Sequence, residues 1–63
     1  MNELMTLSQT LKAAQRELIV NAARTGRLPP DGVIRKIAEL ESAIIAVDTL
    51  IGESEGGKDD HAG

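Results

Sequence analysis

The chain has 63 residues, a formal net charge of −3, no cysteine and no aromatic residue. It has room for one small domain, and disulfides, thiolate metal sites and aromatic core packing are all excluded. A scaffold of this size normally needs a disulfide, a metal or oligomerisation, so association with another chain is the remaining route to stability.

The first predicted element is a helix over residues 3–25. Asn2 is a candidate N-cap, and Glu3 suits the positive end of the helix dipole. Apolar residues then recur at spacings of three and four, the heptad pattern of a helix that packs along one stripe: Leu4, Leu7, Leu11, Ala14 and Leu18. The same register reaches Asn21, which would fix register or oligomeric state if buried. Because a straight helix drifts from a strict heptad, we expect Ala22 to take the core position instead.

A turn at residues 26–29 follows from the glycine and prolines. Gly26 is a candidate left-handed C-cap, Pro29 disfavours helix before it, and Pro30 suits the first position of a new helix. The second helix is predicted over residues 30–52. Its apolar stripe also alternates spacings of four and three: Val33, Ile37, Leu40, Ile44, Val47 and Ile51.

These elements predict an all-α fold, an antiparallel two-helix hairpin over residues 1–52, because the helices are matched in length and the turn is short. Asp31 is either a first-turn acid or an N-cap, and Gly52 is expected to end the second helix. Residues 53–63 are polar, glycine-rich and acidic, so they are predicted to form a disordered tail.

Both helices carry more apolar surface than one hairpin can bury. Residues 18–23 and 43–51 are apolar on more than one face, and a helix that is apolar all round is buried all round. The surplus indicates either a homodimer that packs as a four-helix bundle or a face that docks a different protein, and the two can coexist. The candidate residues of this additional interface are Ile19, Ala22, Ile34, Ile45 and Leu50.

The residue types needed for catalysis are scarce, so we expect a protein that is not an enzyme and uses neither a cofactor nor a metal. The chain has no Tyr or Cys, and its one histidine, His61, follows Asp59 and Asp60 in the predicted tail. With no apolar run near the ~20 residues of a membrane span and no signal-peptide pattern, we expect no membrane partner and a cytoplasmic location.

Basic residues cluster near the turn. They are either solvated surface charges or contacts for an acidic protein surface or RNA. The absence of aromatic side chains for base stacking disfavours single-stranded RNA. The candidates are Arg24, Arg27, Arg35 and Lys36.

The layout of residues 3–52 resembles that of small homodimeric helical-hairpin regulators of plasmids and phages, of which the Rop-like RNA-binding proteins are the best-known type. The shared features are the size, two helices, a short turn and an acidic C-terminus. Rop-like proteins bind RNA through polar and aromatic residues, and this chain has no aromatic residue, so no functional residue is carried over. In size and helical content the chain also resembles phage inhibitors of host regulators, such as quorum-sensing anti-activators, which implies a protein partner.

The leading hypothesis is therefore a homodimeric interaction module. It would bind another protein, for example a host transcriptional regulator, and inhibit or modulate it. The alternatives are a Rop-like RNA-binding regulatory dimer and a structural or assembly subunit.

Overall fold

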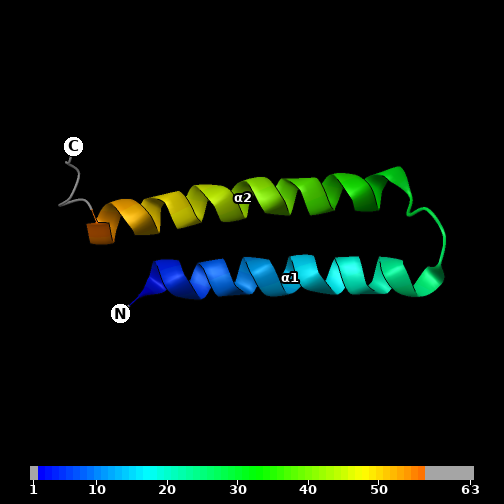
Figure 1. Cartoon of the computed structure of the whole chain (residues 1–63), viewed down its shortest axis with the longest axis horizontal. Helices are drawn as coiled ribbons and strands as arrows, with labels where there is room; N and C mark the ends of the chain where they lie inside the picture. The colour runs from blue at the N-terminus through cyan, green and yellow to red at the C-terminus, as the bar shows by residue number, and fades with distance from the viewer. Residues whose placement is uncertain (1, 57–63) are drawn as a thin grey trace.

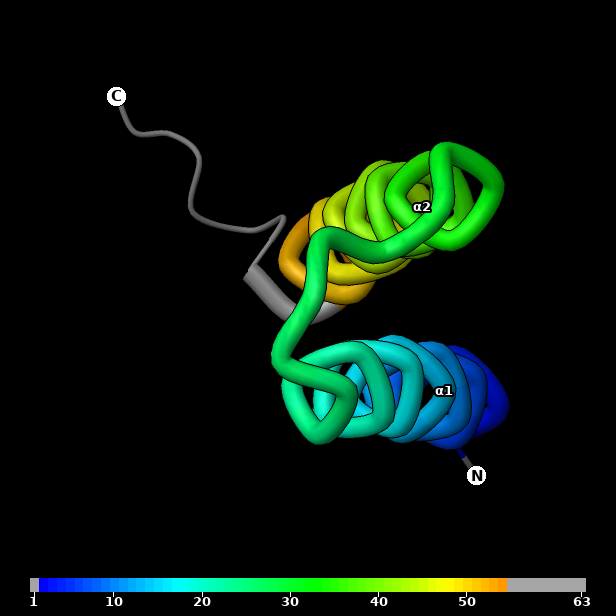
Figure 2. Tube along the Cα trace, turned by 90° about the vertical axis from the view of Figure 1, so that its right-hand side faces the viewer, coloured from blue at the N-terminus to red at the C-terminus, as the bar shows by residue number. Residues whose placement is uncertain are grey.

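A computed structural model of the chain describes residues 2–56 and consists of two antiparallel α-helices. Helix α1 spans Glu3–Thr25 and helix α2 spans Asp31–Gly56. The helices run side by side from the turn to the open end (Figure 1). Seen from the turn end, they form one layer of two helices (Figure 2). The predicted all-α hairpin is confirmed.

The two ends of α1 are held in different ways. At the N-terminus the Asn2 carbonyl accepts the Thr6 amide at 3.1 Å, but the Asn2 side chain makes no capping hydrogen bond. At the C-terminus Gly26 adopts φ 69° and ψ 10°, and its N–H donates to the Ala23 carbonyl at 3.2 Å. This is the left-handed cap that the sequence predicts, a conformation that glycine adopts without steric cost.

Helix α2 begins one residue later and ends four residues later than predicted. The Pro30 carbonyl accepts the amides of Val33 at 2.9 Å and Ile34 at 3.1 Å, so Asp31 is a first-turn acid rather than the N-cap. The helix continues through Gly52, which does not adopt a positive φ. A glycine inside a helix costs only about 1 kcal/mol relative to alanine, so it does not by itself end one.

The predicted tail over residues 53–63 is therefore divided. Residues 53–56 belong to α2, and the rest lies outside the described residues. His61, Asp59 and Asp60 are in that outer part.

The interface between the helices is a narrow seam. Ile44, at 6% exposure, and Ser8, at 4%, are the buried side chains among residues 2–54. The other five residues of the predicted α2 stripe are half-buried. From α1 the seam takes its half-buried residues at the same alternating spacing: Leu4, Leu11, Gln15, Leu18 and Ala22.

The seam on α1 differs from the predicted stripe at two positions. Leu7 is 44% exposed and Ala14 is exposed, whereas Ser8 and Gln15 face α2 in their place. Helix α1 is therefore rotated by part of a turn relative to the predicted register. The physical reason is that Ser8 and Gln15 form hydrogen bonds across the seam, while a single facing helix covers only part of a wide apolar stripe. As predicted, Ala22 rather than Asn21 occupies the seam near the turn.

The left-handed cap at Gly26 can be tested against Gly52, a glycine in the interior of α2, as a matched control. Gly26→Ala is expected to destabilise the hairpin by about 1 kcal/mol, since an L-residue is strained at positive φ. Gly52→Ala should instead stabilise it by about 0.5–1 kcal/mol, because Gly52 is inside α2 and its added Cβ would meet no atom within 4 Å. Urea denaturation followed by circular dichroism measures both. Equal effects of the two substitutions would contradict the cap assignment.

Candidate functional site

One side of the seam is spanned by polar contacts. The Ser8 hydroxyl donates to an Asp48 carboxylate oxygen at 2.7 Å, and the Lys12 ammonium lies 3.4 Å from the other oxygen. One turn of α1 farther on, the Gln15 amide donates to the Glu41 carboxylate at 2.8 Å. We call the side that carries these five residues the bridged face.

The electrostatics of the bridged face centre on Asp48. The hydrogen bond from Ser8 holds the pKa of Asp48 below its ordinary value, the nearby Lys12 ammonium lowers it further, and partial desolvation opposes both. The side chains of Lys12 and Asp48 are 56% and 45% exposed, so solvent screens their ion pair strongly. This contact orients the helices more than it stabilises them.

The opposite side of the seam carries mainly apolar side chains, with Glu17, Asn21 and Lys36 beside them in the half near the turn. Residues at spacings of three and four form a row on one side of a helix. Ala14 and Leu18 of α1 and Leu40 of α2 line the same hollow, so the rows that contain them lie on the same side of the hairpin. We call this side the apolar face. From α1 it comprises Leu7, Leu11, Ala14 and Leu18, and from α2 Leu40, Ala43, Val47 and Leu50.

The apolar face is uneven along its length. At the open end Leu7 and Leu50 are 44% and 49% exposed, and Leu7 also lines a shallow depression of about 570 Å³ with Asn2 and with Glu3, Thr6 and Thr10 of α1. In the half near the turn the surface is hollowed twice. One hollow of about 500 Å³ is lined by Ala14, Glu17, Leu18, Asn21, Lys36 and Leu40. A second of about 450 Å³ lies at the turn itself and shares Leu18 and Asn21 with the first.

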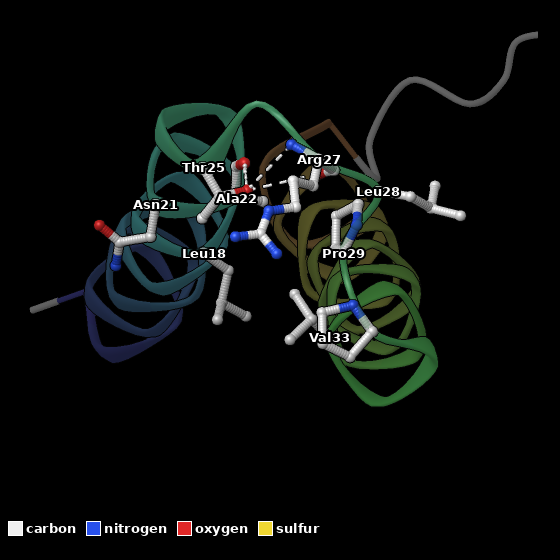
Figure 3. A pocket seen from close by; sticks show the side chains of 9 residues that line it. Leu18, Asn21, Ala22, Thr25, Arg27, Leu28, Pro29 and Val33 are labelled. Carbon is white, nitrogen blue, oxygen red and sulfur yellow. Dashed lines mark hydrogen bonds between the residues drawn. The ribbon is translucent and has the colours of Figure 1, made fainter.

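The turn adds an exposed apolar residue, Leu28, that the sequence analysis did not single out, and it also positions the basic candidate Arg27. Leu28 is 84% exposed, and its side chain points away from the gap between the helices (Figure 3). The Arg27 guanidinium reaches across that gap, above Leu18 and Val33 (Figure 3). Pro29, directly after Leu28, was the available signal, because a residue before proline is restricted to an extended backbone and so does not continue a helix.

The predicted additional interface does not form one patch. Ile19, Ile34 and Ile45 are exposed on the bridged side, Leu50 belongs to the apolar face, and Ala22 lies in the seam. Near the turn, the bridged face carries a shallow, open groove of about 430 Å³. We call it the turn groove, and its apolar lining includes Ile19, Ala22, Ala23, Pro29 and Ile37.

Charge is separated along the hairpin. None of the four basic candidates Arg24, Arg27, Arg35 and Lys36 forms an ion pair within residues 2–54, where Lys12–Asp48 is the pair observed. At the other end, residues 2–10 and 49–54 contain two charged side chains, Glu3 and Glu53, and both are acidic, while Asp48 lies farther from the end and is paired with Lys12. The turn end is therefore positive and the open end negative.

The described helices show neither a membrane span nor a cluster of potential metal ligands. No helix there is long and apolar enough to cross a bilayer. No group of three or more His, Cys, Asp or Glu side chains in that part of the chain could hold a metal ion. Comparison of the chain with known protein families, with curated proteins and with solved structures finds no match.

The bridged face predicts a specific dependence of stability on pH. A carboxylate with a lowered pKa in the folded state stabilises it above the unfolded pKa of about 3.9, and this contribution is lost as pH falls through the folded pKa. Stability should therefore decrease on acidification below about pH 4. Asp48→Asn should flatten that decrease, as measured by denaturant unfolding across pH.

Ser8→Ala serves as the second arm, because the Ser8 hydroxyl is the main cause of the lowered pKa. Ser8→Ala should also reduce the loss of folding stability on acidification. The double variant should show little further reduction of that loss beyond Asp48→Asn alone. If both single variants lost stability below pH 4 as steeply as the wild type, the Ser8–Asp48 hydrogen bond would not persist in solution.

Proposed function

We propose that this chain is a helical-hairpin interaction module that acts as a homodimer, and that the dimer binds another protein and modulates its activity. The observation that supports the proposal is the exposure of large apolar side chains on both sides of a two-helix layer. Soluble monomers rarely leave contiguous apolar surface of this kind uncovered, and such surfaces mark sites of protein association.

The two sides suit different occupants. Within residues 2–54, the polar contacts between the helices lie on the bridged face and none crosses the apolar face, so the apolar face suits a second helical layer. On the bridged side, Lys12, Asp48 and Glu41 occupy the middle, and exposed apolar surface is concentrated at the turn groove and around Ile45. A dimer formed through the apolar face would leave the turn groove free for a different protein, and the groove is lined by Arg27, which forms no ion pair within residues 2–54.

Self-association is tested on the apolar face. We expect a dimer in sedimentation equilibrium at micromolar concentration and a thermal midpoint that rises with concentration. Leu7→Asp should weaken the dimer by at least ~100-fold, because it would place an unpaired charge in the interface at a cost of several kcal/mol. Leu7 is outside the intrachain seam, so this loss would not come from the hairpin itself.

Gln9→Asp is the matched control. It adds the same charge in the same turn of α1, but two positions along, where the side chain lies on a different side of the helix. It should leave the dimer intact. A wild-type monomer that unfolds sharply and independently of concentration would refute self-association.

Partner binding is tested at the turn groove. Ile19→Glu should leave the dimer folded and should abolish capture of a protein from extracts of the native host. Val20→Glu, an exposed apolar residue next along α1 that does not line this groove, should retain capture. Equal capture by both variants would refute the groove as the binding site. If the captured material were RNA and disappeared on nuclease treatment, the RNA-binding alternative would replace this proposal.

A further inference from the structure

We propose that a second copy of the chain packs on the apolar face in the antiparallel sense, with its turn at the opposite end from the first turn. The two copies would be related by a two-fold axis level with Ala14 and Ala43, so that α1 lies on α1 of the partner and α2 on its α2. The inference rests on the self-association of the proposed function, and it specifies the face and the direction.

The area of the apolar face fits a second copy. Each helix has about 23 residues facing the other, which corresponds to about 35 Å in length and about 10 Å in width. Two such helices side by side present on the order of 700 Å², and a stable interface of standard size buries about 800 Å² per partner. A second hairpin of the same length covers the whole face, which a shorter segment would not.

The middle of the apolar face carries small side chains, Ala14 on α1 and Ala43 on α2. Ala14 is the central residue of α1. Because Ser8 lies opposite Asp48 and Gln15 lies opposite Glu41, Ala14 is level with the Ser42–Ala43 pair near the middle of α2. Small residues allow two helices to approach closely, so the centre suits a two-fold axis where each alanine meets its own copy.

The relief of the face favours the antiparallel sense. A two-fold axis at the centre, perpendicular to the helices, carries Leu7 of one copy to the level of Asn21 of the other. Asn21 and Leu18 line both hollows of the turn half. The exposed leucine of each copy would therefore lie against the hollows of the turn half of the other, which Leu18 and Asn21 line.

Charge favours the same direction. The antiparallel arrangement brings the positive turn of one copy beside the negative open end of the other, at both ends of the dimer. A parallel arrangement would place Leu7 against Leu50 of the other copy. It would also bring together two turns that each carry Arg24, Arg27, Arg35 and Lys36, which form no ion pair within residues 2–54. Juxtaposed like charges oppose association.

Because the chain contains no cysteine, single cysteine substitutions read out the geometry directly. We expect Ala14→Cys alone, and Ala43→Cys alone, to form disulfide-linked dimers under mild oxidation. A disulfide requires Cβ atoms about 3.5–4.5 Å apart, so each should cross-link at least ~10-fold faster than Ala13→Cys, which lies on the outer side of α1. Circular dichroism and sedimentation establish that each variant is folded and dimeric before oxidation.

A mixture of the Ala14→Cys and Ala43→Cys variants distinguishes the antiparallel from the parallel arrangement. If Ala14→Cys cross-linked only with Ala43→Cys and neither formed a disulfide alone, the parallel sense would be correct and this inference wrong. Equally fast cross-linking of Ala13→Cys would place the interface on another face and also overturn it. A wild-type monomer in sedimentation would refute the proposed self-association itself, which is a separate result. The dependence of dimer affinity on salt concentration is an independent test. Raising the salt concentration should weaken an antiparallel dimer, which is held by opposite charges, and would strengthen a parallel dimer, in which like charges meet.

Discussion

Two helices can bury only one stripe of each against the other, and this limit governs the whole molecule. Ile44 and Ser8 are the side chains that become buried within residues 2–54, although the apolar residues of both helices are numerous. A hairpin that satisfies its backbone hydrogen bonds within each helix still leaves large apolar side chains such as Leu7, Ile45 and Leu50 about half exposed. Since burial contributes roughly 25 cal/mol per Å², the surplus surface favours a further layer strongly.

The polar contacts decide which side remains available for that layer. Ser8 and Gln15 turn α1 so that their side chains meet Asp48 and Glu41, and the same rotation carries Leu7 and Ala14 out of the seam. The heptad stripe of α1 thus straddles two surroundings, partly against α2 and partly on the apolar face. A stripe of this width is typical of a four-helix bundle, in which each helix contacts two neighbours.

Local sequence signals predicted the fold, whereas the relative rotation of the helices could not be read from them. The left-handed cap at Gly26 and the complete α2 stripe follow from turn chemistry and periodicity. The prediction that α2 ends at Gly52 was wrong, because a glycine is compatible with both a helix interior and a helix cap. The rotation of α1 depends on hydrogen bonds from Gln15 to Glu41, 26 residues away in the chain, and from Ser8 to Asp48, 40 residues away. The apolar periodicity of one helix does not contain information on such distant partners.

The distribution of polar groups also limits where a different protein can bind. Covering the middle of the bridged face would desolvate Lys12, Asp48 and Glu41, and desolvating charges generally costs more than their mutual attraction returns. That middle therefore favours water over an apolar partner. The turn groove avoids the cost, because Ile19 and Ala23 present apolar surface there and Arg27 adds a positive charge that has no ion-pair partner within residues 2–54. Among the surfaces of the bridged side, the turn groove is thus the one that suits an apolar partner segment with acidic residues at its edge.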